Sequence, residues 1–352
     1  MPSVTKALRA LPDMSILPYP AVDGGKAFKD HVISWTFGEY EEQIRKEMYV
    51  DACATPGGSG AIATTFSVYT NPLDSIFVSN VRWQYDRFAD RAKLKIYEHN
   101  MFDQDGFDLK SFDSELEKLC KIQKQVVVIV NDPCHNPTGY TLSLAEFRSI
   151  TEILNKYKEN NIIFLYDIAY LEYTSEADKR IKMLELLKLE EHVMTVLAFS
   201  GSKTFGVYGL RLGAAIGLTK SKSKIDKFRP SFVNEARGSW SATPTISIEL
   251  LNHFSQKENH NTFKKELTHI NSIVKKRSEL FISQANEIGL KTYPFRSGFY
   301  VIVLTDKPME IFEKLSTVGI YVVPMNNGIR IALCSISLKE IDGLPQKIKK
   351  FL

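Results

Sequence analysis

The sequence holds only four cysteines, and their spacing argues against two kinds of structure. Cys53, Cys120, Cys134 and Cys334 lie far apart and form no CxxC pair. Zinc sites and disulfide frameworks usually need closely spaced cysteines, so we expect neither. The HExxH motif of zinc peptidases is also absent. Free cysteines fit a reducing compartment, and we therefore expect a cytoplasmic protein without a bound metal.

Long apolar segments are absent as well. The longest apolar runs, such as Val126–Val130 and Ile162–Tyr166, are far shorter than the roughly 20 residues that a helix needs to cross a bilayer. The first thirty residues contain no apolar stretch of signal-peptide length. We therefore expect no membrane partner and no export signal.

Neither sign of charge is in large excess. The sequence has 45 lysines and arginines against 41 aspartates and glutamates, a net charge of +4 without a basic tract. This balance gives no reason to expect nucleic acid as a partner. Hydrophobic residues make up 44% of the chain and charged residues 24%, which is ordinary for a soluble globular protein. The 352 residues exceed one ordinary core and suggest two domains.

The middle of the chain alternates short apolar runs with amphipathic stretches, which predicts an α/β fold. A helix is expected between two of the strands, where apolar residues from Leu142 to Tyr157 recur at helical spacing after the capping box of Ser143 and Glu146. Apolar strands separated by helices indicate a mainly parallel sheet covered on both faces. The expected strands are Ser75–Ser79, Lys93–Tyr97, Val126–Asn131, Ile162–Asp167, Val193–Ser200 and Leu212–Leu218.

From about residue 262 the pattern changes to that of a smaller α+β domain. We therefore expect a large domain at residues 1–262 and a small domain at residues 263–352. A second capping box, Ser337 and Glu340, begins a closing helix. The other expected elements are a long charged helix from Phe263 to about Ile288, strands in Gly298–Leu304 and Ile329–Cys334, and a helix near Met309–Val318.

Polar segments follow three of the expected strands. They are Asn131–Gly139, Asp167–Tyr170 and Ser200–Lys203. Ligands of open α/β sheets bind beyond the carboxyl ends of the strands. The three segments therefore point to one crevice.

A glycine-rich turn at Thr55–Ala61 is a candidate phosphate site. Such a turn entering a helix exposes backbone N–H groups at the positive end of the helix dipole, and Ser59 adds a hydroxyl donor. A tight turn with a helix cap would explain the same residues. A dinucleotide fingerprint is a further alternative, although the segment before the turn is a poor strand.

Together these segments resemble the class I pyridoxal-phosphate-dependent aminotransferases, in particular the aspartate and aromatic branch. The glycine-rich turn, Trp83, the HNPTG of His135–Gly139, the Asp-x-Ala-Tyr of Asp167–Tyr170 and the Ser-x-Ser-Lys of Ser200–Lys203 follow one another in the family's order. The resemblance runs from about Tyr19 to Arg330. It implies the aspartate-aminotransferase fold (fold type I), with a mainly parallel sheet and a smaller α+β C-terminal domain, and pyridoxal 5'-phosphate as cofactor.

The resemblance also implies a role for each matching residue near the cofactor ring. Lys203 would form the Schiff base and move the Cα proton. Asp167 would pair with the protonated pyridine nitrogen. Asn136 and Tyr170 would donate to the phenolic oxygen, and Trp83 would stack on the ring. Asn136 and Trp83 would also border the substrate.

Two further groups of residues are implied for the phosphate and for the substrate. The phosphate would be held by Gly58, Ser59, Ser200, Ser202 and Arg211. Arg330 would bind the α-carboxylate of the substrate, and Arg237 would reach across a dimer to a side-chain carboxylate. Tyr19 would contact the phosphate of the neighbouring subunit, so the resemblance implies a homodimer with shared active sites.

The sequence departs from the family pattern at two places. Asp86 stands where the aspartate enzymes usually have a histidine that supports the pyridine-bound acid. A second carboxylate near Asp167 would raise a pKa unless another group bridges the two. Either the local alignment slips at this position, or the cofactor is tuned differently in this branch. The segment before Tyr19 is shorter than in the family, and the usual N-terminal arm and the loop that covers the substrate have no counterpart. This indicates either a truncated start or a naturally open site.

The reaction that the sequence favours is amino-group transfer between an L-amino acid, aspartate or glutamate, and a 2-oxo acid such as 2-oxoglutarate. Aromatic amino acids are the alternative substrates. The other hypotheses are a different pyridoxal-phosphate reaction such as a β-lyase or a decarboxylase, a regulator built on an aminotransferase-like domain, and a nicotinamide oxidoreductase.

Overall fold

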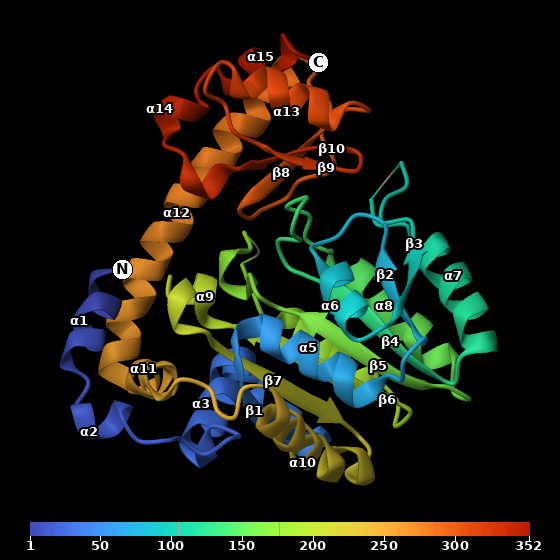
Figure 1. The fold of residues 1–352 in the computed structure, drawn as a ribbon, viewed down its shortest axis with the longest axis vertical. Helices are drawn as coiled ribbons and strands as arrows, with labels where there is room; N and C mark the ends of the chain where they lie inside the picture. The colour runs from blue at the N-terminus through green and yellow to red at the C-terminus, as the bar shows by residue number, and fades with distance from the viewer. Residues whose placement is uncertain (105, 176) are drawn as a thin grey trace.

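A seven-stranded sheet forms the middle of the larger part of the molecule (Figure 1). The structure is a computed structural model that describes residues 1–104, 106–175 and 177–352. Strands β3, β2, β4, β5 and β6 run parallel, whereas β7 is antiparallel to both β6 and β1. The mainly parallel sheet expected from the sequence is therefore confirmed. The order is β1-β7-β6-β5-β4-β2-β3, with β1 (Tyr49–Pro56), β2 (Ser75–Ser79), β3 (Lys95–His99), β4 (Gln125–Asn131), β5 (Asn161–Asp167), β6 (Val193–Ser200) and β7 (Leu212–Thr219).

All six expected strands are present, but the sheet has one more. The segment before the glycine-rich turn, which we expected to be a poor strand, is β1, and that expectation is wrong. Its residues Ala52, Cys53 and Ala54 are small and have modest strand propensity. They are nevertheless fully buried, and Cys53 pairs with Ala215 of β7. Packing in the sheet therefore overrides the local propensity.

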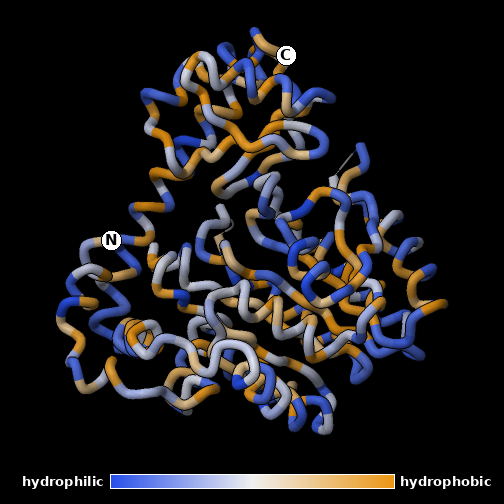
Figure 2. Tube along the Cα trace, in the orientation of Figure 1, coloured by the Kyte–Doolittle hydropathy of each residue, from blue (hydrophilic) through white to orange (hydrophobic). Residues whose placement is uncertain are grey.

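Each face of the sheet carries its own hydrophobic core. Successive residues of a strand point to opposite faces, so Val127 and Ile129 of β4 enter one cluster and Val126 and Val128 the other. Helices α5, α6 and α10 supply side chains to the first cluster, and α3, α7 and α8 supply them to the second. Apolar residues run through the middle of this part of the molecule in Figure 2, whereas hydrophilic residues lie mostly along its outer helices.

The helices of the described residues connect these strands and surround them. Helix α8 begins with the expected capping box, in which Ser143 and Glu146 satisfy each other's backbone N–H groups. No helix among the residues that the structure describes is long and apolar enough to span a membrane. The helices are α1 (Pro2–Ala10), α2 (Asp13–Ile16), α3 (Gly25–Phe37), α4 (Glu41–Glu47), α5 (Gly57–Tyr69), α6 (Tyr85–Arg91), α7 (Leu109–Ile122), α8 (Leu144–Lys156), α9 (Gly201–Thr204), α10 (Lys222–Ser239), α11 (Thr245–Ser255), α12 (Lys257–Glu287), α13 (Pro308–Ser316), α14 (Leu338–Ile341) and α15 (Leu344–Lys349).

The C-terminal part is the expected smaller α+β unit. Its antiparallel sheet has the order β8-β10-β9, with β8 (Tyr300–Leu304), β9 (Val323–Met325) and β10 (Gly328–Ala332). The expected capping box of Ser337 and Glu340 is present and begins the short α14. The long helix α12 starts at Lys257, earlier than the expected Phe263, and leads from the large part to the small one (Figure 1).

Candidate active site

A cavity of about 200 Å³ lies beyond the carboxyl ends of β4, β5 and β6. All the predicted site residues except Tyr19, Arg237 and Arg330 line it, although they come from six separate segments of the chain. Three segments that the sequence placed at strand ends therefore do meet, as open α/β sheets require. The lining residues are Gly58, Ser59, Ile62, Trp83, Asn131, Asn136, Asp167, Ala169, Tyr170, Ser200, Ser202, Lys203, Tyr208 and Arg211.

Lys203 reaches the cavity from α9, directly after β6. Its Nζ lies 5.2 Å from the centroid of the Tyr170 ring, and its backbone carbonyl accepts a hydrogen bond from the Tyr173 hydroxyl at 2.8 Å. Burial lowers the pKa of the Lys203 ammonium, the carboxylate of Asp167 opposes this shift, and the cation of Arg211 adds to it. A lysine with a lowered pKa is more often neutral, and the neutral amine is the nucleophilic form.

Asp167 ends β5 and is only 5% exposed. Its Oδ2 accepts a hydrogen bond from the Tyr85 hydroxyl at 2.7 Å, and its Oδ1 accepts one from the backbone N–H of Ala169 at 3.1 Å. Burial raises the pKa of the Asp167 carboxyl, and the Tyr85 hydrogen bond and the Lys203 cation lower it again in part. The carboxylate therefore faces the cavity with two hydrogen-bond donors that carry no charge.

Asp86 pairs with Arg82 and not with Asp167, which supports the first of the two alternatives, a slipped local alignment. Asp86 points to the outside and accepts from Arg82 Nε at 2.9 Å and from Nη2 at 2.5 Å. The preceding residue, Tyr85, occupies the place beside Asp167 instead. The one-residue displacement arises because the ion pair directs Asp86 outward and leaves the first residue of α6 buried.

Arg330 approaches the same cavity from the small sheet. Its Nη1 donates to Oδ1 of Asn136 at 3.0 Å, and its guanidinium lies 4.4 Å from the centroid of the Tyr300 ring. Asn136 in turn donates to the Tyr170 hydroxyl at 3.4 Å. The Nε atom of Arg330 is buried and has no hydrogen-bond partner, which leaves a donor for an anionic ligand.

Asn131, for which no motif predicted a separate role, holds the loop that carries Asn136 by hydrogen bonds. Oδ1 of Asn131 accepts from the backbone N–H of Asn136 at 2.8 Å, and its Nδ2 donates to the carbonyl of Asp167 at 3.0 Å. One side chain thus sets the spacing between the amide and the carboxylate of the site. Only its position at the end of a predicted strand marked it beforehand.

The glycine-rich turn and Arg211 form the cationic end of the cavity. Gly58 and Ser59 lie in the first turn of α5, whose N-terminus is positively polarised. Arg211 donates to the Ser202 hydroxyl at 3.3 Å and to the carbonyl of Tyr208 at 2.7 Å. The hydroxyls of Ser200 and Ser202 are buried beside it. This combination of a helix N-terminus, hydroxyls and a guanidinium suits a phosphate group.

Tyr19 and Arg237 do not reach the cavity of their own chain. Tyr19 is 89% exposed, and Arg237 lies in the last turn of α10, where it donates only weakly to the Ser241 hydroxyl at 3.4 Å. Both side chains therefore remain available to contacts outside the chain.

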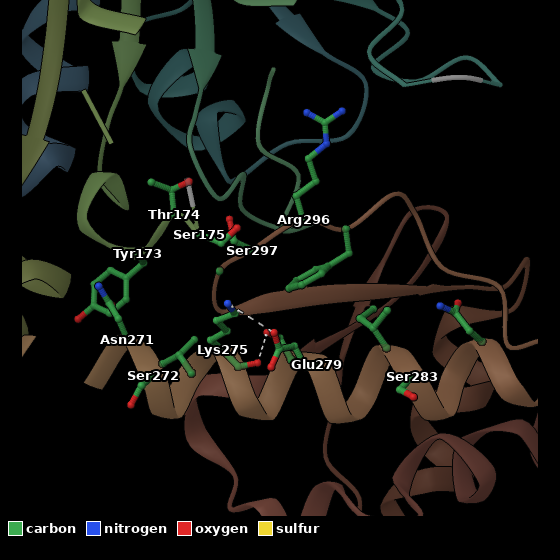
Figure 3. Close-up of a pocket in the computed structure, with 16 residues that line it drawn as sticks. Tyr173, Thr174, Ser175, Asn271, Ser272, Lys275, Glu279, Ser283, Arg296 and Ser297 are labelled. Carbon is green, nitrogen blue, oxygen red and sulfur yellow. Dashed lines mark hydrogen bonds and ion pairs between the residues drawn. The ribbon is translucent and has the colours of Figure 1, made fainter. Parts of the chain in front are cut away.

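A larger cavity of about 640 Å³ lies elsewhere, between α12 and the segments Tyr173–Ser175 and Phe295–Gly298 (Figure 3). Its charged side chains largely satisfy each other: Lys275 and Glu279 form an ion pair at 3.7 Å, and Arg296 points away from α12. Neither Lys203 nor Asp167 lines it. Size alone would select this cavity, but the convergent polar groups select the smaller one.

Comparisons with known proteins identify the family to which the chain is similar. The family model described as aminotransferase class I and II matches residues 1–348. An aspartate aminotransferase of Salmonella typhi is 25% identical over 275 residues, which are 77% of this chain and 68% of that protein. An aromatic-amino-acid aminotransferase of Pseudomonas aeruginosa is 28% identical over 209 residues, 58% of this chain and 51% of that protein.

Solved structures are similar over the whole chain. An aminotransferase from Anaerococcus prevotii has a TM-score of 0.95 at 29% identity and is covered to 87% by the complete chain. An aromatic-amino-acid aminotransferase from Burkholderia pseudomallei, covalently bound to pyridoxal phosphate, has a TM-score of 0.81 at 20% identity over 99% of this chain and 88% of that one, which shows a common fold. The chain thus belongs to the class I and II aminotransferases, with the fold of aspartate aminotransferase.

Proposed function

We propose that this aminotransferase uses pyridoxal 5'-phosphate, bound through Lys203, to move an amino group between L-aspartate or L-glutamate and a 2-oxo acid such as 2-oxoglutarate. The observation that carries the proposal is the meeting of a half-buried lysine, a buried carboxylate and a cationic phosphate cradle in one cavity. These groups fit the cofactor because each matches one part of it: the aldehyde, the ring nitrogen and the phosphate.

The cofactor, when bound, supplies an electron sink for the bonds at the substrate Cα. We assign Lys203 to hold it and then to carry a proton at Nζ, since burial keeps the pKa of this amine below its usual value. Asp167 would meet the positive ring nitrogen, which gives the buried carboxylate the cationic partner that it lacks in direct contact. Asn136 and Tyr170 would donate to the phenolic oxygen, and Trp83 would cover the ring.

The remaining predicted residues would bind two anionic groups, the phosphate of the cofactor and the α-carboxylate of the substrate. We assign Gly58, Ser59, Ser200, Ser202 and Arg211 to the phosphate. Arg330 would bind the α-carboxylate of the substrate, and its unpartnered Nε supports this role.

We further propose a homodimer in which Tyr19 and Arg237 complete the partner's site. Their exposure supports this, as does the exposure of two apolar side chains, Met14 and Leu17, that lie close to Tyr19 in the sequence. Arg237 would then pair with the side-chain carboxylate of an acidic substrate. We also propose that residues 1–262 bind the cofactor, that residues 263–352 form the smaller domain that carries Arg330, and that the enzyme is cytoplasmic, in line with its four free cysteines.

Aromatic amino acids are the second candidate substrates. Tyr170 and Trp83 line the cavity, and the guanidinium of Arg330 lies on the Tyr300 ring. An assay of amino donors with 2-oxoglutarate as acceptor tests both candidates. A preference for aspartate and glutamate supports the first, and a preference for phenylalanine and tyrosine selects the second. The absence of transfer with every donor, despite a bound yellow cofactor, would contradict the transaminase proposal.

A further inference from the structure

Tyr85 makes the shortest side-chain contact to Asp167 in the described part of the chain. Its ring is 2% exposed, and its hydroxyl donates to Oδ2 of Asp167 at 2.7 Å. The ring meets Trp83 edge to face, with 5.5 Å between the centroids. A tyrosine that only fills a core needs no carboxylate partner. The hydrogen bond to Asp167 therefore indicates a role for Tyr85 beyond packing.

The turn before α6 fixes the direction of the Tyr85 side chain. The backbone N–H of Tyr85 donates to the carbonyl of Trp83 at 2.6 Å. Arg82 fastens the outer side of the turn through ion pairs with Asp86 and Glu98, at 2.5 Å and 2.6 Å. Trp83 therefore faces the cavity, Tyr85 points inward beneath it, and Asp86 points outward.

We propose that Tyr85 is a positioning residue for the transfer reaction, whose hydroxyl holds the Asp167 carboxylate ionised and oriented toward the ring nitrogen of the cofactor. The proposal rests on the proposed function. The Tyr85 donor lies on one carboxylate oxygen and the Ala169 N–H on the other, so the plane of the carboxylate is fixed from both sides. A phenol also donates at every neutral pH, because burial holds its pKa well above 10. A histidine in this role would change its charge in the neutral range.

The two histidines near Tyr85 do not change charge near neutral pH, so the pH dependence of a Tyr85 variant should report the titration of Asp167. His99 and His135 line the small chamber on which Tyr85 also borders. Burial lowers their pKa values to about 4 and about 3, so both imidazoles are neutral above about pH 5. Asp132 of the same chamber is paired with Lys182 at 3.0 Å. Lys203 and Tyr170 are the remaining ionisable neighbours.

The first test uses the whole chain of 352 residues without cofactor, so that it does not depend on the proposed function. Burial raises the pKa of Asp167 above its unfolded value, and the Tyr85 hydrogen bond opposes this rise. In Tyr85→Phe the pKa therefore rises further, and the added loss of stability appears as pH increases through it. We expect Tyr85→Phe to raise the unfolding equilibrium constant by a factor that is about tenfold greater at about pH 8 than at about pH 4.5.

Two further variants separate positioning from simple packing. Tyr157→Phe is the matched control, because its hydroxyl also donates to an aspartate, Oδ1 of Asp113 at 2.8 Å, far from the site. The loss of folding stability in Tyr157→Phe should not change as pH rises through the pKa of Asp167. In an Asp167→Asn background, Tyr85→Phe should lose its pH dependence, since no charge remains to be held. An equal loss at both pH values in Tyr85→Phe would overturn the proposal.

The second test measures the cofactor directly. Tyr85→Phe should weaken the binding of pyridoxal 5'-phosphate about tenfold, as judged by equilibrium dialysis, and should shift the pH titration of its visible absorption band. Tyr157→Phe should leave both unchanged. Unaltered affinity and titration in a folded Tyr85→Phe protein would contradict the proposal. If the unmodified protein binds no pyridoxal phosphate, the proposed function fails, whereas the coupling of Tyr85 and Asp167 is still decided by the cofactor-free experiment.

Discussion

Arg330 of the small sheet donates to Asn136 of the large part at 3.0 Å, and this contact joins the two units at the candidate active site. Arg330 lies on β10 opposite Ile302 of β8 and Val323 of β9, in the middle of its sheet. Asn136 lies on the loop after β4. A ligand held by both side chains therefore touches both units at once, and the pair is the natural place to begin mutational tests.

Arg330→Ala should weaken kcat/KM for every amino donor, since each donor carries an α-carboxylate. Truncating one partner of a buried charge pair costs roughly 2–5 kcal/mol. Arg330→Lys should recover only part of this, because an ammonium cannot bind a carboxylate in bidentate fashion or lie flat on the Tyr300 ring. Steady-state kinetics with aspartate and phenylalanine provide the measurement. A loss confined to one donor would rule out the α-carboxylate role.

Lys203→Ala should abolish transfer and the adduct that borohydride traps between the enzyme and pyridoxal phosphate. The reason is that Lys203 is the lysine that lines the cavity. Peptide mapping of the reduced wild-type protein should locate the modified residue at Lys203. A label on another lysine would show that the cofactor is not bound through Lys203.

Arg237→Ala should reduce the use of aspartate and glutamate strongly and that of phenylalanine little, if Arg237 pairs with a distal carboxylate. The expected cost is again roughly 2–5 kcal/mol for the acidic donors. Mixing this variant with Lys203→Ala should restore activity, since a hybrid dimer would contain one site with both residues intact. Equal losses for acidic and aromatic donors would refute the assignment, and absence of rescue after proven subunit exchange would refute shared sites.

Gly57→Ala should weaken the binding of pyridoxal phosphate. Gly57 has φ +73°, and a Cβ there would lie 2.4 Å from Nη2 of Arg211, so the guanidinium must move away from the phosphate cradle. Gly206→Ala is the matched control. Gly206 has φ +67° with open space around the added carbon, so it should cost only roughly 1 kcal/mol of backbone strain. Dialysis and thermal unfolding of both variants compare the two effects, and equal cofactor affinities would contradict the expectation.

Much of the sheet and of the cavity could be predicted from the sequence because the informative residues follow strands. Asp167, Ser200 and Asn131 each end an apolar run, and the carboxyl ends of parallel strands meet at one edge. Such a run identifies its own strand without help from the rest of the fold. Strand β1 gave no comparable signal, since its small residues are buried by contacts with distant parts of the chain, namely β7 and the helices α3, α5 and α10.

Tyr85 could not be predicted in the same way. A tyrosine in a mixed segment is indistinguishable from a core aromatic, and its direction depends on the ion pairs that Arg82 makes across the turn. Tyr208 also lines the cavity, at the start of a short 3-10 turn (Tyr208–Leu210) that no sequence motif predicts. Tyr19 and Arg237 raise a different difficulty, because their surroundings depend on surfaces outside one chain.

Helix α12 has a consequence for dividing the chain into pieces. Phe263 and Leu267 of its first half belong to the core of the large part, whereas Phe281 and Ala285 of its second half belong to the core of the small part. A cut at either end of α12 therefore strips one core of its helix and leaves apolar surface exposed to water. Either unit expressed alone would therefore expose apolar surface that α12 covers in the whole chain. Fragments that end near residue 262 should be insoluble, even though the pattern of the sequence changes there.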